Sequence, residues 1–298
     1  YNLQKYNIFN IYLSKFKNWY SANKNGDTNL NNYVQLINYT KGGSYDVSFV
    51  SIDGKGINTK DITFISDKPG STYKINKNDS LTINYSFELE PGKNLTKTYT
   101  FFGSKYEIKS KISFAGFSDL ISNNTYDLVW SNGIRSVERN SVDEANYSNA
   151  SVYYGDEQVI VDASSVGEKE VKEFRGRVDW LTVRNKYFAA IIIPDDLKKV
   201  EGAYIEGIQE VRGKDGLHET YDARLTLPFQ NQKVETQSFT LFIGPVDYKE
   251  LEAYGRNLVK IVDFGSFFGL KFVVRPIAEY VLLPLFQFIN SFIPNYGV

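Results

Sequence analysis

The segment Leu81-Thr-Ile-Asn-Tyr-Ser-Phe-Glu-Leu89 alternates apolar and polar side chains at strict period two. Successive side chains of a β-strand point to opposite faces of a sheet, so this period predicts a strand with one buried face. Pro91-Gly92 follows directly and predicts a turn. The alternation resumes at Tyr99 and Phe101 and again from Tyr106 to Phe114. Together these segments predict a meandering antiparallel sheet.

Shorter runs of the same kind lie on both sides of this sheet. Tyr45 to Phe49 alternates, and Asp53-Gly54 then predicts a turn. Further short runs bounded by Gly, Pro, Asn or Asp follow at 152–154, 159–161, 188–193, 203–208, 221–227 and 239–243. Many short strands with exposed turns are typical of a sandwich. The sequence therefore predicts a mainly β fold, with a large antiparallel β-sandwich over residues 1–245.

The composition supports this fold and excludes several kinds of site. Among 298 residues, 22 are Tyr and 21 are Phe, which fit the half-buried surface of a sheet. A net charge of -1 provides no basic field, so we expect no nucleic-acid partner. The chain has no Cys, which excludes disulfides, thiolate nucleophiles and Cys-ligated metals. It begins at Tyr1 and ends within an apolar run, and we therefore expect an excerpt from a longer protein.

Helical periodicity is confined to residues 246–298, which we assign to a second, C-terminal helical region. The spacing of Tyr248, Leu251 and Leu258 after Pro245 predicts one or two short helices. Residues 280–298 carry no charge, and a helix of that length would rise roughly 28 Å, close to the hydrocarbon thickness of a bilayer. Because proline and polar residues interrupt this stretch, we do not predict a membrane-spanning helix within it.

An amphipathic helix in the membrane interface is the prediction for the start of this tail. Lys271, Arg275 and Glu279 recur every fourth residue on one helical face, and apolar residues lie opposite. We expect Arg275 to reach lipid headgroups and to pair with Glu279 as well. The alternative is a buried C-terminal helix docked on the sandwich. The predicted interface residues are Phe267, Phe268, Leu270, Lys271, Val273, Val274, Arg275 and Ile277.

Catalytic, cofactor-binding and metal sites are not predicted. His218 is the only histidine and lies next to a turn at Gly213 to Gly216, so a histidine pair or a catalytic triad has no second member. Asp195-Asp196 follows Pro194, but no further acid occurs at the spacing of a cation-binding loop, which favours a solvated turn. We therefore predict a protein that is not an enzyme.

Two surface features remain open to interpretation. Trp130, Trp180 and Tyr187 are candidates to line a sugar-binding or peptide-binding cleft. The alternative is that these aromatic side chains pack in the core. The mixed charges of residues 168–173 predict an exposed hairpin or an edge strand.

Three stretches carry a resemblance to a known family. They are Trp130-Ser-Asn-Gly-Ile-Arg-Ser136 with its continuation to Gly155, Gly176-Arg-Val-Asp-Trp180 with its continuation to Pro194, and Leu241-Phe-Ile-Gly-Pro245 with its continuation to Val298. In order and spacing they resemble the large periplasmic domain of the bacterial YidC membrane protein insertases, of the YidC/Oxa1/Alb3 family. The resemblance extends from about Tyr99 to Val298, and the first forty residues do not carry it.

The resemblance implies a twisted supersandwich like that of sugar mutarotases, followed by short α-helices. It also implies a location on the periplasmic side of the inner membrane of a Gram-negative bacterium, with a transmembrane segment and the insertion groove beyond the chain. The expected role is to assist insertion and folding of inner-membrane proteins as a scaffold. Expected partners are the Sec translocon with its accessory subunits, nascent inner-membrane proteins, and the membrane surface. The alternative is a carbohydrate-binding or mutarotase-like sandwich protein of the cell envelope.

Overall fold

A computed structural model describes residues 2–4, 7–17, 33–38, 42–68, 73–213, 216–263 and 271–292. The chain divides into two compact units, Tyr1–Val246 and Asp247–Val298. Residues 18–32 and the chain end at 293–298 lie outside the described residues.

The described residues of the first unit form three sheets, and every pair of neighbouring strands in them is antiparallel. The order in the six-stranded sheet is β13 (Lys169–Arg175), β16 (Gly202–Arg212), β17 (Gly216–Pro228), β10 (Thr125–Ser131), β4 (Ser44–Val50) and β5 (Gly56–Asn58). The order in the nine-stranded sheet is β12 (Glu157–Val161), β11 (Asn149–Tyr154), β14 (Val178–Arg184), β15 (Phe188–Pro194), β18 (Val234–Pro245), β9 (Glu107–Ala115), β8 (Lys93–Phe102), β7 (Ser80–Glu90) and β6 (Ile65–Ser66).

Smaller elements complete the first unit. The third sheet consists of β1 (Asn2–Gln4), β2 (Asn7–Lys17) and β3 (Tyr33–Asn38). Short helical turns connect strands at η2 (Thr59–Asp61), η3 (Ser122–Asn124), α1 (Ser141–Ala145) and η4 (Leu197–Lys199). The predicted mainly β, antiparallel architecture is therefore confirmed.

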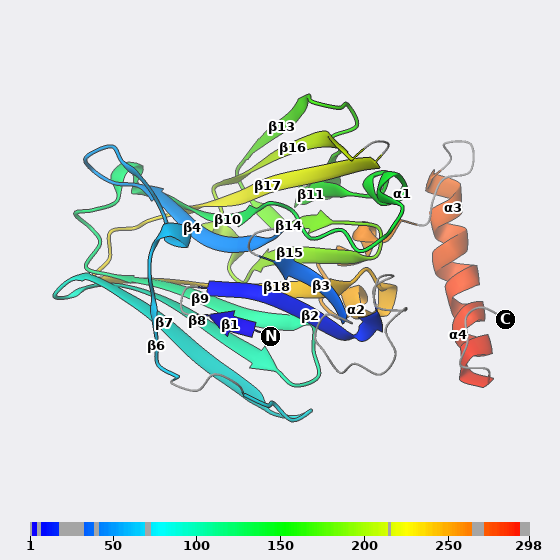
Figure 1. Cartoon of the computed structure of the whole chain (residues 1–298), viewed down its shortest axis with the longest axis horizontal. Helices are drawn as coiled ribbons and strands as arrows, with labels where there is room; N and C mark the ends of the chain where they lie inside the picture. The colour runs from blue at the N-terminus through cyan, green and yellow to red at the C-terminus, as the bar shows by residue number, and fades with distance from the viewer. Residues whose placement is uncertain are drawn as a thin grey trace. The chain divides into compact units, whose positions relative to one another are not determined.

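The two large sheets face each other and enclose the main core (Figure 1). The rings of Tyr45 on β4 and Tyr99 on β8 meet edge to face with centroids 6.3 Å apart, and the Phe114 ring on β9 lies 4.9 Å from that of Tyr126 on β10. Such aromatic pairs add about 0.5 to 1.5 kcal/mol beyond the area they bury. The period-two pattern that predicted these strands thus directs alternate side chains into this core.

A buried lysine interrupts the apolar pattern. Lys97 on β8 lies at an inward position and is fully buried. Its ammonium donates to Thr59 Oγ1 at 2.6 Å and lies 3.5 Å from Asp46 Oδ1, which forms a buried ion pair. Burial lowers the pKa of Lys97 to about 8, and the charge of Asp46 opposes this shift. The pair links β4 of one sheet to β8 of the other.

A second buried charge gives the first unit a pH-dependent stability. Glu219 on β17 is 7% exposed and accepts hydrogen bonds from Gln209 Nε2 and the Tyr221 hydroxyl, both at 2.7 Å. Burial, opposed by these two hydrogen bonds and reinforced by the charge of Asp162, raises the pKa of Glu219 to about 7. The folded protein therefore binds more protons than the unfolded chain between the ordinary carboxyl pKa and about pH 7.

The free energy of unfolding is thus expected to fall as the pH rises through this window. The Glu219→Gln variant is expected to lack the part of this fall that ionisation of Glu219 causes. Because the pKa of Glu219 is raised in the folded protein, its stabilising contribution is complete below the pKa of Glu219 in the unfolded chain. That contribution is lost as the pH rises to 8. At pH 8 the variant should be about 2 kcal/mol more stable than the parent, and at pH 4 the two should agree. Urea unfolding at pH 4, 6 and 8 measures this, and an equal pH dependence in both proteins would contradict it.

The second unit is helical. It contains α2 (Tyr248–Glu252), η5 (Leu258–Ile261), α3 (Lys271–Ile277), the π-helical turn η6 (Ala278–Leu282) and α4 (Leu283–Phe292). Asp247 caps α2, since its Oδ1 accepts from the backbone N–H groups of Lys249 and Glu250 at 3.0 and 3.1 Å. The expected short C-terminal helices are therefore present.

Candidate functional site

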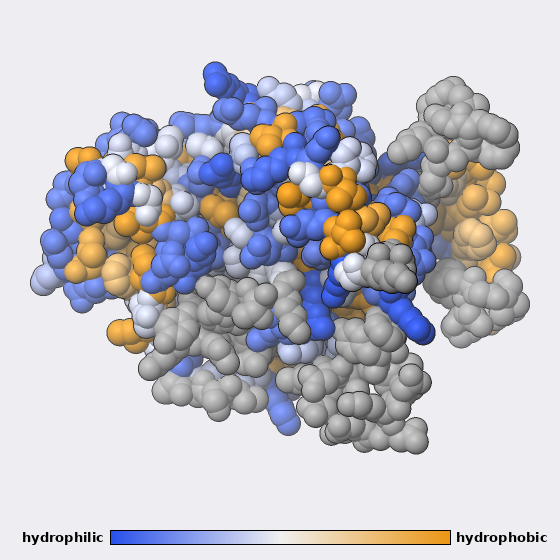
Figure 2. Space-filling view, turned by 45° about the horizontal axis from the view of Figure 1, so that its top comes forward, coloured by the Kyte–Doolittle hydropathy of each residue, from blue (hydrophilic) through white to orange (hydrophobic). Residues whose placement is uncertain are grey.

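The helical segment 271–292 exposes an unusual amount of apolar surface. Tyr280, Phe288 and Phe292 are 79%, 64% and 72% exposed. Other exposed apolar side chains on the same segment are Ile277, Val281, Leu282, Leu285 and Phe286. In Figure 2 the described surface of this segment is largely apolar. Soluble domains rarely expose a contiguous apolar patch of this kind unless it contacts a membrane or a protein.

Polar groups gather near the start of this segment. The Arg275 guanidinium lies 2.7 Å from Glu279 Oε1, one helical turn away, and its Nη2 donates to the Val259 carbonyl at 2.9 Å. From Tyr280 to Phe292 the helix carries no charged residue. The segment therefore has one charged end and a long apolar remainder, an arrangement typical of helices that meet a membrane surface.

The predicted interface residues are only partly described by the structure. Phe267, Phe268 and Leu270 lie outside the described residues, and the side chains of Lys271 and Val273 are likewise not described. The other three lie on α3, where Val274 and Arg275 are half-buried and Ile277 is 48% exposed. The prediction that these eight residues form a membrane interface stays a prediction.

Proline does not end the helix where the sequence suggested an interruption. Pro284 is the second residue of α4, and the π-helical turn η6 directly precedes it. The wider π-helical turn accommodates the proline ring and the lack of a backbone N–H, so the helix continues through Pro284. Even so, none of the helices in the described ranges is both long and apolar enough to cross a bilayer.

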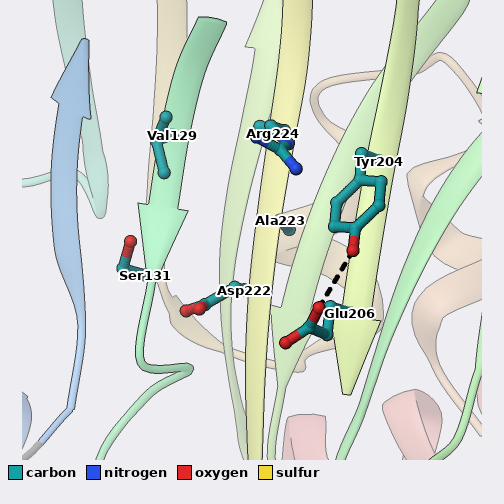
Figure 3. A pocket seen from close by; sticks show the side chains of 7 residues that line it. All are labelled: Val129, Ser131, Tyr204, Glu206, Asp222, Ala223 and Arg224. Carbon is teal, nitrogen blue, oxygen red and sulfur yellow. Dashed lines mark hydrogen bonds between the residues drawn. The ribbon is translucent and has the colours of Figure 1, made fainter. Parts of the chain in front are cut away.

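A polar hollow of about 160 Å³ lies on the face of the six-stranded sheet that points away from the core (Figure 3). Its walls come from β10, β17 and β16, whose inward residues, such as Trp130, Leu225 and Ile205, are buried. Strand register places Tyr204 opposite Arg224 and Glu206 opposite Asp222. The lining residues are Val129, Ser131, Tyr204, Glu206, Asp222, Ala223 and Arg224.

Each carboxylate oxygen of Glu206 accepts one hydrogen bond within this hollow. The Tyr204 hydroxyl donates to its Oε2 at 2.9 Å, and Lys169 Nζ donates to its Oε1 at 2.6 Å. The hydrogen bond from Lys169, followed by that from Tyr204, lowers the pKa of Glu206. Pairing with the same carboxylate raises the pKa of Lys169. Glu206 is therefore an ionised, structural member of the site.

The sequence did not single out this hollow. Period-two alternation places 204 and 206, and likewise 222 and 224, on one face of their strands. The two pairs of residues lie together only because β16 and β17 pair in one register. No local sequence pattern specifies that register.

The three aromatic residues proposed for a cleft are not gathered at one surface. Trp130 and Trp180 are 2% and 0% exposed, which fits the alternative that they pack in the core. Trp130 Nε1 donates to the Gly133 carbonyl at 2.6 Å, and the Trp180 ring stacks on Tyr153. Tyr187 is 42% exposed and lies beside Lys186, whose ammonium is 5.2 Å from the ring centroid.

The remaining candidate residues have local partners. His218 Nδ1 lies 3.3 Å from Ser136 Oγ, and burial, followed by the charge of Arg212, lowers its pKa. Asp195 accepts from the Thr240 hydroxyl at 3.1 Å, and Asp196 caps η4. Over the described ranges, no group of three or more potential ligands could hold a metal ion. The charged run at 168–173 contributes to β13, an edge strand as predicted.

Comparison with solved structures finds weak similarity to carbohydrate-active proteins. A galactose mutarotase related enzyme from Lactobacillus acidophilus matches 72% of this chain and 83% of its own, with 8% identity and a TM-score of 0.35. An alpha-N-acetylgalactosaminidase from Bifidobacterium bifidum matches 70% of this chain and 32% of its own, with 9% identity and a TM-score of 0.41.

Comparison with protein families and curated sequences gives a specific match. The family model of the YidC periplasmic domain matches residues 18–280. A membrane protein insertase YidC from Chloroherpeton thalassium is 33% identical over 257 residues, which are 86% of this chain and 43% of that protein. The corresponding protein of Prosthecochloris aestuarii is 34% identical over 263 residues, 88% of this chain and 44% of that protein.

The chain thus spans less than half the length of these curated relatives. Its family match covers most of the sandwich together with the start of the helical segment, and so confirms the resemblance found in the sequence. The chain therefore belongs to the YidC periplasmic domain family, which lies on the periplasmic side of the inner membrane and is not a family of enzymes.

Proposed function

We propose that this chain assists the insertion and folding of inner-membrane proteins and that its helical segment lies in the membrane interface. The observation that carries the proposal is the exposed apolar surface of residues 277–292 behind the charged pair Arg275 and Glu279. In water this surface is costly, whereas burial at the acyl boundary is favourable by about 25 cal/mol per Å².

The charged end fits the same arrangement. Arg275 and Glu279 are 31% and 19% exposed, and their side chains form an ion pair. A guanidinium can keep this pair and still meet a phosphate, because a partly exposed pair contributes only about 0 to 1 kcal/mol. The proposed interface comprises Phe267, Phe268, Leu270, Lys271, Val273, Val274, Arg275 and Ile277, together with the exposed residues that follow.

The lengths of the relatives support separate roles for this chain and for the rest of such a protein. These relatives are membrane protein insertases more than twice as long as the matched region. We place the insertion step in parts of such a protein outside this chain, with residues 1–245 as a periplasmic scaffold and residues 246–298 as its link to the membrane. Nascent inner-membrane proteins are the proposed clients, and the Sec translocon with its accessory subunits is the proposed partner.

Complementation of a depleted insertase tests this function. Cells that rely on a full-length insertase carrying this domain should insert client proteins more slowly when Leu285 and Phe286 are both replaced by Glu. The reason is that two carboxylates on the apolar surface oppose its entry into the interface. Growth and protease protection of a client report the result. Normal insertion by the double variant, at equal protein level, would contradict the proposed role of the helical segment.

A further inference from the structure

The polar hollow on the outer face of the six-stranded sheet contains a carboxylate with unused acceptor capacity. Asp222 Oδ1 accepts from the Asn132 backbone N–H at 2.8 Å, and Asp222 makes no other hydrogen bond within the described part of the chain. A carboxylate has about four acceptor sites, so most of them face solvent here. Asp222 also lies directly opposite Glu206, whose charge is paired with Lys169. A cationic side chain of a partner can use the acceptor sites that Asp222 leaves open.

Next to this carboxylate lies a cation whose partners leave donors available. The Arg224 guanidinium lies over the Tyr204 ring, with its Cζ 4.2 Å from the ring centroid. This contact restricts the orientation of the guanidinium plane. Its ion pair with Asp127 is long, with 3.8 Å between Nη1 and Oδ2, and the other Asp127 oxygen accepts from the Thr226 hydroxyl. The Arg224 side chain is 43% exposed. A guanidinium has five N–H donors in a fork that fits a carboxylate.

The spacing of these two charges matches an extended polypeptide. Asp222 and Arg224 are two residues apart on β17 and lie on the same face, as Figure 3 shows. Residues i and i+2 of any extended strand are separated by roughly 6.6 Å, so a second strand repeats this distance. The hollow of about 160 Å³ is also smaller than the roughly 300 to 1,000 Å³ of small-molecule pockets. It is suited to single side chains of a larger partner.

We propose that this hollow binds an extended segment of a partner protein that carries an acidic and a basic side chain two residues apart. The acidic side chain pairs with Arg224, the basic one with Asp222, and Val129 and Tyr204 contact the stems. The segment docks through side chains on the face of the sheet and leaves the backbone groups of the edge strand β13 unused. The residues of this site belong to the first unit and those of the proposed membrane contact to the second, so failure of this proposal would leave the membrane contact untouched.

A peptide titration of the whole 298-residue chain tests the proposal. The probe is acetyl-Ser-Glu-Ser-Lys-Ser-amide, and the control peptide has Gln in place of both Glu and Lys. Backbone amide shifts in a ¹⁵N NMR spectrum should move at residues 128–131, 203–206 and 221–225 with the charged probe only. Because exposed ion pairs are weak, each pair should contribute about threefold in affinity and be weakened by salt.

Conservative variants identify the charges responsible. Asp222→Asn retains an acceptor for the Asn132 N–H and removes the negative charge, whereas Arg224→Gln removes the positive charge. Each variant should bind the charged peptide about threefold more weakly than the parent. Asp119→Asn, which breaks an exposed 2.9 Å pair with Lys93 elsewhere on the sandwich, should have no effect. The proposal is overturned if the charged probe causes no shifts at these residues, if the Gln peptide causes the same shifts, or if both site variants bind like the parent.

Discussion

Replacing Phe288 and Phe292 together by Glu is expected to weaken binding of the chain to phospholipid vesicles by at least about 100-fold. The two rings are 64% and 72% exposed and pack edge to face with centroids 5.1 Å apart. Burying one such side chain in an apolar medium contributes about 1.5 to 3 kcal/mol, and each 1.4 kcal/mol is tenfold in affinity. Flotation with vesicles of mixed zwitterionic and anionic lipid measures the loss.

A matched variant separates this effect from general charge repulsion. Ile52 and Leu89 are exposed on the sandwich at 64% and 47%, and their double replacement by Glu adds the same charge. This control should float like the parent, and both variants should retain the parent's urea midpoint because none of the four side chains is buried. Equal loss of binding in both double variants would contradict an interfacial role for the helix.

Replacing Asp46 by Ala is expected to lower the free energy of unfolding by about 3 to 5 kcal/mol. Lys97 is fully buried and lies 3.5 Å from Asp46 Oδ1, so the variant leaves a buried ammonium without its counter-charge. Deprotonation would limit the loss, since the pKa of Lys97 is already lowered to about 8 by burial. The destabilisation should therefore be smaller at pH 9 than at pH 6, as measured by urea unfolding.

The double variant Asp46→Ala with Lys97→Met provides the internal control for this ion pair. Replacing a buried pair by apolar side chains of similar volume is often neutral, so the second substitution should recover most of the lost stability. The double variant can also be as unstable as Asp46→Ala alone. The loss of stability then arises from lost packing or from the lost hydrogen bond between Thr59 and Asp46, and the uncompensated charge is not its cause.

The strands were predictable because their pattern is local. The alternation of residues 81–89 falls within β7, and the runs that follow Pro91-Gly92 fall within β8 and, apart from Tyr106, within β9. An inward lysine at position 97 does not follow from such a pattern, because its partners Asp46 and Thr59 come from distant segments. Burial of Trp130 and Trp180 was one of two interpretations, since an aromatic residue in a strand usually packs in a core but can also line a cleft.

The hollow formed by Tyr204, Glu206, Asp222 and Arg224 could not be predicted for a similar reason. Each residue alone looks like an ordinary solvated position, and the site arises only when β16 and β17 pair in one register. For the helical segment, periodicity indicated the charged face at Arg275 and Glu279, and the structure adds their 2.7 Å ion pair. The continuity of the helix through Pro284 depends on a π-helical turn that no sequence pattern indicated.

The depth of a fluorescent label in a bilayer shows whether the helical segment enters the membrane interface. The chain contains no Cys, so Phe288→Cys and Leu89→Cys each introduce a single site for an environment-sensitive fluorophore. With vesicles present, the label at 288 should shift to the blue and be quenched by lipids with nitroxides on the acyl chain, while the label at 89 should stay unchanged. A label at 288 that remains in water while the protein is bound to vesicles would contradict insertion of the helical segment into the interface.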